Sequence, residues 1–159
     1  MIEYRKIIPP DNKIIADIIT AIMKEFKDDP KGTIVEDPTL HTMYENYNNN
    51  NGVYYIAVED EKILGGAGIN QLAGVSEKVC ELQRMFLLPE SRGKGIGQKL
   101  MDMCIDAAKD SGYEKIYLET LDNMESARKL YLKSGFEFID KPLGNTGHCG
   151  CNTWMVLEL

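Results

Sequence analysis

One stretch in the middle of the chain constrains its fold more than any other. An apolar segment at residues 79–88 ends at Pro89, a glycine-rich loop follows, and residues 95–110 carry apolar side chains at helical spacing. Ser111 and Gly112 end this helix, and residues 115–119 form a second apolar segment. A connection of helix length joins two parallel strands. The stretch therefore predicts a β-α-β unit at the centre of the fold.

The segments around this unit predict further strands and helices. The connection between residues 53–58 and 63–72 is too short for a crossover, so we expect an antiparallel hairpin there. Glycines in its second strand, at positions 65, 66 and 68, indicate a bulge or a close approach of another backbone or ligand. Further strands are expected at 2–8, 136–139 and 153–157, and further helices at 14–26, 39–47 and 124–133. The predicted fold class is α/β, with one mixed sheet flanked by helices in a single domain over residues 1–159.

The glycine-rich loop carries the clearest chemical signal. Gly93, Gly95 and Gly97 stand directly after a strand and at the start of a long helix, beside the cations Arg92 and Lys94. A helix N-terminus presents unpaired N–H groups and partial positive charge, and glycine lets an anion approach them closely. The spacing fits neither a Walker A loop nor the dinucleotide fingerprint. The loop predicts a pyrophosphate cradle, the alternative being a helix start that needs glycine only for packing.

Composition limits the other classes of function. The 159 residues carry a net charge of −7, which argues against a nucleic-acid partner because an acidic chain repels phosphate backbones. No apolar run approaches the ~18 residues of a membrane helix, and the first residues do not resemble a secretory signal. We expect a cytoplasmic protein whose four cysteines remain reduced thiols.

The motif Arg92-Gly93-Lys94-Gly95-Ile96-Gly97 resembles the Arg/Gln-x-x-Gly-x-Gly/Ala motif of the GNAT superfamily of acetyl-CoA-dependent N-acetyltransferases. Downstream, the family's Asn…Ala…Leu-Tyr…Lys…Gly-Phe signature is similar to Asn123, Ala127, Leu130-Tyr131, Lys133 and Gly135-Phe136. Asn123 stands four residues before Ala127, one more than in the common pattern. The matching segments cover roughly residues 53 to 140.

The resemblance implies acetyl-CoA as cosubstrate and no metal. It implies a parallel pair of strands, 79–88 and 115–119, that splay apart at the centre of a mostly antiparallel sheet, with pantetheine in the opening. A backbone N–H at Met85 is implied to polarise the thioester carbonyl, as oxyanion-type stabilisation. The implied cofactor-binding residues are Met85, Phe86, Leu87, Arg92, Gly93, Lys94, Gly95, Ile96, Gly97, Asn123 and Lys133.

Two residues are candidates for acid–base chemistry. Glu81 is a carboxylate in an apolar strand and stands 11 residues before Arg92, the spacing of the base glutamate in some members of the family. It could instead face solvent at an edge or pair with Arg84, and Glu119 is an alternative base. Tyr131 matches the family's tyrosine acid, but its helical spacing also fits simple core packing.

The acceptor side is less defined by the sequence. The resemblance implies that residues 39–47 lie over the acceptor side, so that His41, Tyr44 and Tyr47 line the acceptor pocket. The alternative is a surface histidine with the tyrosines in the core. Glu119, on the neighbouring strand, is a further candidate for this pocket. His148 lies in the loop Gly147-His148-Cys149-Gly150-Cys151, which could shape this pocket or, alternatively, hold zinc. The predicted activity is transfer of an acetyl group to a primary amine of a small molecule by direct attack in a ternary complex. Acetylation of a protein N-terminus or lysine and a non-catalytic CoA-binding module are the alternatives, and a homodimer is possible.

Overall fold

Within the described residues, seven strands form one sheet in the computed structural model, which describes residues 1–27, 29, 31, 34–146 and 150–159. The strands are β1 (Glu3–Lys6), β2 (Val53–Glu59), β3 (Lys62–Gln71), β4 (Val79–Leu87), β5 (Lys115–Thr120), β6 (Glu137–Ile139) and β7 (Thr153–Glu158). Their order in the sheet is β1-β2-β3-β4-β5-β7-β6. Only β4 and β5 pair in parallel, and every other pair is antiparallel. The mixed sheet predicted from the sequence is confirmed, and so is the mostly antiparallel arrangement that the resemblance implied.

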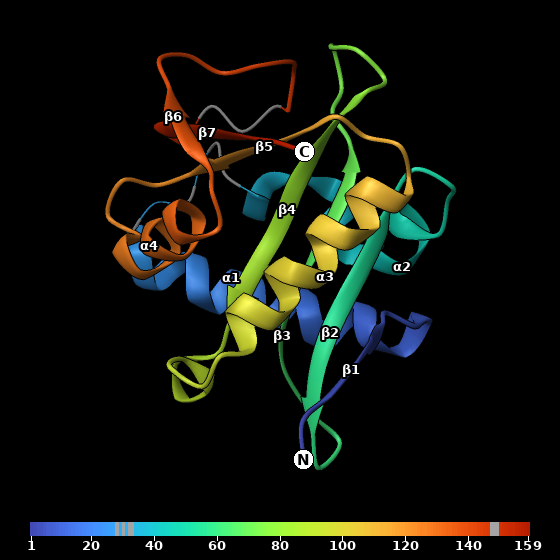
Figure 1. Cartoon of the computed structure of the whole chain (residues 1–159). Coiled ribbons are helices and arrows are strands. Elements are labelled where there is room, and N and C mark those ends of the chain that lie inside the picture. The colour runs from blue at the N-terminus through green and yellow to red at the C-terminus, as the bar shows by residue number, and fades with distance from the viewer. Residues whose placement is uncertain (28, 30, 32–33, 147–149) are drawn as a thin grey trace.

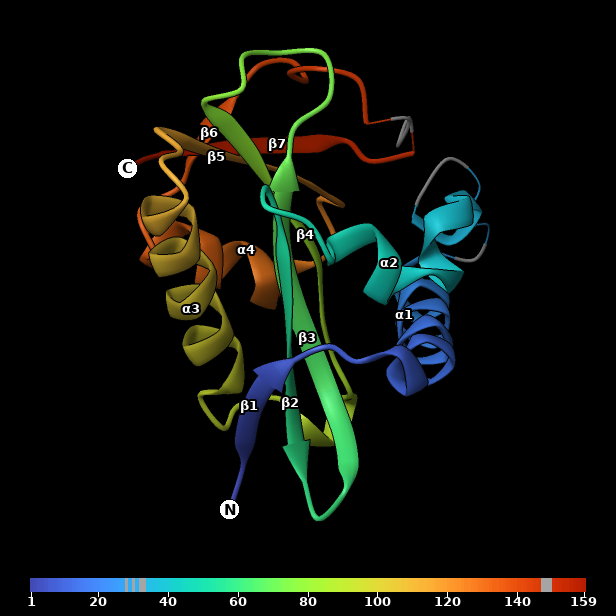
Figure 2. The same ribbon diagram turned by 90° about the vertical axis from the view of Figure 1, so that its right-hand side faces the viewer.

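Helices cover both faces of this sheet. Helices α1 (Asn12–Phe26) and α2 (Met43–Tyr47) lie on one face, and α3 (Ile96–Asp110) and α4 (Glu125–Lys133) lie on the other (Figure 2). Each face has its own apolar core. Ile15, Ile19 and Met43 are buried on the α1 side, and Leu100, Cys104 and Ile116 on the α3 side.

The helix predicted at residues 39–47 is wrong as one element. The chain forms a short 3-10 turn, η3 (Pro38–His41), and then α2, with non-helical backbone angles at Thr42 (φ −126°, ψ 45°) between them. The Asp37 side chain accepts the Thr39 N–H at 2.9 Å and so caps η3. With this arrangement, Asp37 and Thr39 contact Arg84 of β4.

The parallel pair of β4 and β5 separates along its length. The two strands pair only at Val79–Lys115, Cys80–Ile116 and Glu81–Tyr117. Beyond this point β4 continues to Leu87 and β5 to Thr120, but the two strands no longer pair with each other. In Figure 1, β5 runs at a steep angle across the end of β4, whereas β2, β3 and β4 run side by side. This is the splayed opening that the resemblance implied.

A bulge in β4 borders the opening. On β3, Gly68 is opposite Gln83 and Gly66 is opposite Phe86, so β4 contains one more residue than β3 between these pairs. Arg84 lies in the bulge and has a left-handed backbone conformation, with φ of +55°, which is uncommon for a residue other than glycine. Tyr54 supports the bulge, because its hydroxyl donates to the Arg84 carbonyl at 2.7 Å. A Cβ at Gly66 or Gly68 would lie 2.6 Å from the Tyr54 ring, so these glycines make room for that support.

Candidate active site

Two adjoining cavities occupy the opening between β4 and β5. The first, which we call the glycine-loop groove, encloses about 440 Å³ beside Gly93, Gly95 and Gly97. The second, which we call the carboxylate pocket, encloses about 180 Å³ beside Glu81 and Glu119. Met85, Phe86, Met124 and Tyr131 line both cavities. A ligand in the groove and a ligand in the pocket would therefore meet at these four residues.

Backbone groups form the mouth of the glycine-loop groove. Gly93 and Gly95 both have φ of +79°, and no heavy atom lies within 4 Å of the place where a Cβ would be. The Lys99 N–H bonds to the Gly95 carbonyl at 3.1 Å, so the N–H groups before it at the start of α3 lack acceptors within the helix. Such a set of open donors is suited to an anion.

Most of the predicted cofactor residues lie on this groove. Those that line it are Met85, Phe86, Leu87, Arg92, Gly93, Gly95, Gly97, Asn123 and Lys133. Lys94 and Ile96 do not line it: Lys94 is exposed, and Ile96 is buried in the core on the α3 side. Gln98, Ser126 and Ala127 also line the groove and were not predicted, although Gln98 lies on the first turn of the predicted helix.

Two of the motif residues hold the end of α1 over the groove. Arg92 forms a two-point ion pair with Glu25 at 2.8 and 3.1 Å and stacks on the Phe26 ring at 5.6 Å. Asn123 donates from Nδ2 to the Phe26 carbonyl at 2.7 Å. Both contacts end on the last turn of α1, where Phe26 itself lines the groove. The Arg92 and Asn123 side chains therefore shape the groove by fixing α1.

Tyr131 lies at the junction of the two cavities. It is 6% exposed, it packs edge-on against Phe136, and its ring nevertheless lines both the groove and the pocket. Burial, and to a lesser degree the nearby Cys151 thiol, raises the pKa of Tyr131 well above 10.0. The phenol therefore keeps its proton at neutral pH and can donate it to a ligand.

Glu81 lies inside the carboxylate pocket on an internal strand. It is 5% exposed, which excludes the solvated edge position considered above. Gln83, two residues along the same strand face, donates from Nε2 to Glu81 Oε1 at 2.6 Å. The Tyr47 hydroxyl donates in turn to Gln83 Oε1. This chain of hydrogen bonds orients the carboxylate. Gln83 was not predicted as part of the site, although its two-residue spacing from Glu81 places both side chains on the same face of the strand.

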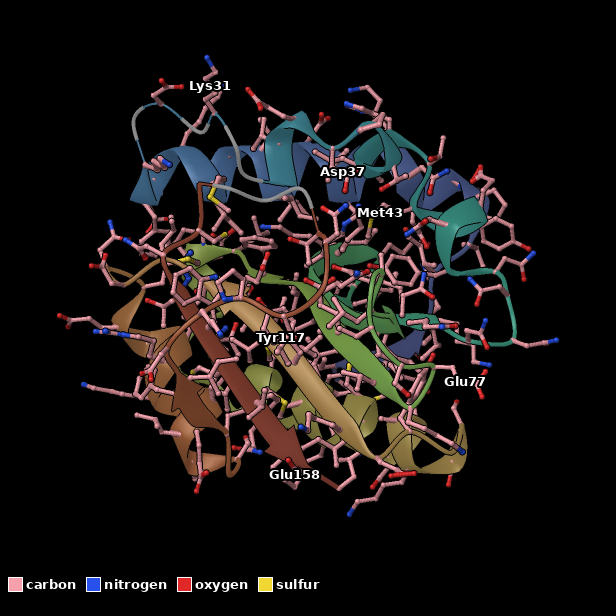
Figure 3. All side chains as sticks on the ribbon, turned by 90° about the horizontal axis from the view of Figure 1, so that it is seen from above. Lys31, Asp37, Met43, Glu77, Tyr117 and Glu158 are labelled. Carbon is pink, nitrogen blue, oxygen red and sulfur yellow. The ribbon has the colours of Figure 1, made fainter. Side chains whose placement is uncertain are left out.

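Glu119 faces the same pocket from β5. The Tyr117 hydroxyl donates to Glu119 Oε2 at 2.7 Å, and the Thr146 hydroxyl donates to Oε1. Burial, followed by these interactions with Glu119, raises the pKa of Tyr117 well above 10.0. Figure 3 labels Tyr117 over the sheet, with Asp37 and Met43 toward the side of α1.

Arg84 fixes the α1 side of the pocket, a role not predicted from the sequence. Its side chain is 4% exposed and pairs with Asp37 at 3.3 Å. It also donates to the Thr39 carbonyl and hydroxyl, and Nη1 lies 2.8 Å from Met43 Sδ. The break after His41 makes this clamp between η3 and the bulge possible.

Several predicted acceptor residues do not reach the pocket. His41 is exposed on η3, and Tyr44 packs against the core on the α1 side; neither lines either cavity. Tyr47 is buried and acts through Gln83. His148 and Cys149 lie outside the described residues, whereas Cys151 lines the pocket. Among the residues that are described, no group of three or more His, Cys, Asp or Glu side chains could hold a metal ion.

Comparisons with known proteins agree with this geometry. Residues 19–136 match the model of the Acetyltransferase (GNAT) family. The chain is 38% identical over 156 residues to the uncharacterized N-acetyltransferase YjgM of Escherichia coli K12, covering 98% of this chain and 93% of that protein. A GNAT-family acetyltransferase structure from Staphylococcus aureus superposes with a TM-score of 0.86 at 25% identity, covering 99% of both chains. A predicted acetyltransferase from Clostridium acetobutylicum, solved with acetyl-CoA, gives a TM-score of 0.73 at 27% identity, covering 90% of this chain and 94% of that one.

The fold and these likenesses define an acetyl-CoA-dependent N-acetyltransferase. The chain belongs to the GNAT acetyltransferase family. No helix formed by the described residues is both long and apolar enough to cross a bilayer.

Proposed function

We propose that this protein transfers the acetyl group of acetyl-CoA to a primary amine of a small molecule, by direct attack within a ternary complex. The observation that carries the proposal is the junction of the two cavities at Met85, Phe86, Met124 and Tyr131. A donor in the glycine-loop groove and an acceptor in the carboxylate pocket would meet there. The pocket is small, at about 180 Å³, and is bordered by Asp37, Asn145, Thr146 and Cys151, which supports a small acceptor.

The groove suits the chemical groups of acetyl-CoA. Open N–H groups at Gly93, Gly95 and Gly97 would hold the pyrophosphate, and Lys133 on the same groove adds positive charge. The apolar side chains of Met85, Leu87 and Leu130 would pack along the pantetheine. When bound, acetyl-CoA supplies an activated acetyl thioester.

The bulge in β4 offers a donor for the thioester carbonyl. Within the described strands, Met85 has no register partner on either β3 or β5. The Met85 N–H would donate to the carbonyl oxygen and stabilise the negative charge that develops during attack. Tyr54 and the Arg84 clamp hold the bulge, so this donor would be fixed before the substrates bind.

Glu81 and Tyr131 would divide the proton transfers. An alkylamine has a pKa of about 10.4, so at neutral pH it must lose a proton before it can attack. Glu81 would accept that proton, directly or through a water, before the neutral amine attacks. The nitrogen loses a second proton as the C–N bond forms, and this proton replaces the one that Tyr131 gives up. Tyr131 would donate its proton to the CoA sulfur as the C–S bond breaks. The Tyr131 phenol suits this role because burial keeps it protonated.

The experiment that tests the proposal is a thiol-release screen. Purified protein with acetyl-CoA is offered small amines, amino acids, aminoglycosides and peptides, and free CoA thiol is followed over time. We expect turnover with small amines and initial-rate patterns of a ternary complex. Turnover with peptides alone would contradict the small acceptor, and CoA binding by calorimetry without thiol release from any acceptor would contradict the activity.

A further inference from the structure

We infer that Met124, held in place by Thr120, forms the wall that faces the acyl group and limits the donor to an acetyl thioester. The inference rests on the proposed function, because it concerns the donor of the same reaction, but one arm of its test needs no acceptor. Met124 would determine specificity by contact with the acyl group. Thr120 would be a positioning residue that acts through Met124. Donors with longer acyl groups, such as butyryl-CoA, would be rejected.

The planar thioester leaves one direction for the acyl chain. Its carbonyl carbon bonds to the oxygen, the sulfur and the acyl chain in one plane, and an amine attacks from outside that plane. In the proposed function the oxygen faces the Met85 N–H and the sulfur faces Tyr131. The other two residues that line both cavities are Phe86 and Met124. The acyl chain would therefore point toward Phe86 and Met124.

Phe86 and Met124 present a buried apolar surface at this point. They are 9% and 8% exposed and belong to the apolar core on the α1 side, which also contains Ile22 and Met23 of α1. Ile22 lines the glycine-loop groove and Met23 lines the carboxylate pocket, so α1 borders both cavities. A methyl group would fit against this surface, whereas a longer chain would have to displace buried side chains.

Met124 is held at its backbone and at its sulfur. A methionine side chain has three rotatable bonds, so without such support it would be a poor barrier. Thr120, the last residue of β5, is 5% exposed, and its hydroxyl donates to the Met124 sulfur at 3.6 Å. The Met124 N–H bonds to the Leu121 carbonyl at 3.1 Å in the turn between β5 and α4. These two contacts give a flexible side chain a fixed position.

The test compares acetyl-CoA with butyryl-CoA in the thiol-release assay, with the fastest-reacting amine as acceptor. In the wild-type protein kcat/KM should be at least about tenfold lower for butyryl-CoA, because added methylenes are discriminated by about this factor or more in an apolar site. Met124→Ala should raise the ratio of butyryl to acetyl about tenfold. The matched control is Met101→Ala on α3, a fully buried methionine that lines neither cavity and should leave the ratio unchanged.

Two substitutions of Thr120 separate its hydroxyl from its shape. Thr120→Val keeps the branched side chain but removes the hydroxyl, so Met124 should become mobile and the ratio should rise about threefold. Thr120→Ser keeps the hydroxyl and should leave the ratio near its wild-type value. A purely structural role of Thr120 would lower the melting temperature of these variants without changing the ratio.

Calorimetry gives a measurement that does not depend on turnover. The Kd of the wild-type protein for butyryl-CoA should exceed that for acetyl-CoA by about tenfold, and the two values should converge in Met124→Ala. If no amine releases thiol, the proposed function is contradicted, and these Kd values still decide the inference: equal values in the wild-type protein would overturn it.

Other outcomes overturn the inference and leave the proposed function standing. They are turnover with equal kcat/KM for the two donors in the wild-type protein, an unchanged ratio in Met124→Ala, or an equal rise of the ratio in Met101→Ala. If Met124→Ala does not fold, the Thr120 variants decide: the same ratio in Thr120→Val and Thr120→Ser would overturn the inference.

Discussion

The two cavities of the opening are built in opposite ways. The mouth of the glycine-loop groove comes from one continuous segment, residues 92–98, and its donors are backbone N–H groups at a helix start. The carboxylate pocket draws side chains from β4, β5, α1, the segment before η3 and the segment before β7. Backbone recognition suits a ligand that is common to a whole family, because it depends on conformation. Side-chain recognition can change with single substitutions and leaves the conformation intact.

The largest expected effect comes from a substitution in the carboxylate pocket that leaves the glycine-loop groove unchanged. Glu81→Gln keeps the hydrogen bond with Gln83 within reach but removes the base, so kcat/KM for the acceptor should fall about 100- to 1,000-fold at pH 7. The loss should shrink as the pH approaches the amine pKa of about 10.4, where neutral amine is already present. Steady-state thiol release from pH 7 to 10 measures both effects. A loss that stays constant over this range would assign Glu81 to positioning.

Tyr131, one of the four residues shared by both cavities, should show a different pH dependence. Tyr131→Phe should lower kcat about 100-fold and leave CoA affinity unchanged. Because burial raises its pKa, Tyr131 keeps its proton above the pH at which an ordinary tyrosine loses it. The defect should therefore remain constant from pH 7 to 9, in contrast to that of Glu81→Gln. Tyr113→Phe is the control, since Tyr113 is also buried but donates to the Asn51 carbonyl away from both cavities. Unchanged kcat in Tyr131→Phe would remove the acid role.

The groove should respond to backbone changes. Gly95→Ala places a Cβ in a left-handed residue, which costs about 1 kcal/mol, and directs it into open space at the groove. KM for acetyl-CoA should rise about tenfold while KM for the acceptor changes little. Gly112→Ala offers a matched control, because Gly112 has φ of +84° and open space around it at the other end of α3. The two variants should lose similar melting temperature, and equal KM values for acetyl-CoA would contradict the cradle.

The same contrast explains what the sequence could predict. Strand β4, helix α3 and strand β5 follow from local periodicity and glycine placement, and nine of the eleven predicted cofactor residues line the groove. The pocket depends on contacts between distant segments. Arg84 meets Asp37 only because a bulge turns one and a broken helix presents the other. Neither the bulge nor the helix break produces a repeating pattern of apolar residues in the sequence. For this reason His41 and Tyr44 were predicted to line the pocket, and Asp37 and Arg84 were not.

The smallest expected effect concerns the ion pair between the last turn of α1 and the glycine-rich loop. Glu25 and Arg92 form a two-point ion pair, but their side chains are 40% and 33% exposed, so solvent screening limits the pair to at most about 1 kcal/mol. Glu25→Gln should raise KM for acetyl-CoA about threefold and leave kcat nearly unchanged, because Arg92 still stacks on Phe26 and Asn123 still holds its carbonyl.

The hydrogen bond from Arg92 lowers the pKa of Glu25 below its ordinary value of 4.5. The pair therefore stabilises the fold above about pH 4.5, and this stability is lost as the pH falls through the lowered pKa. The difference in melting temperature between wild type and Glu25→Gln should accordingly be present at pH 7 and vanish in acid. Glu90→Gln removes the more exposed ion pair with Lys62, outside both cavities, and should leave KM for acetyl-CoA unchanged. If Glu25→Gln behaves like Glu90→Gln in that assay, Arg92 does not need its partner on α1, and the backbone of residues 92–98 suffices to hold the cofactor.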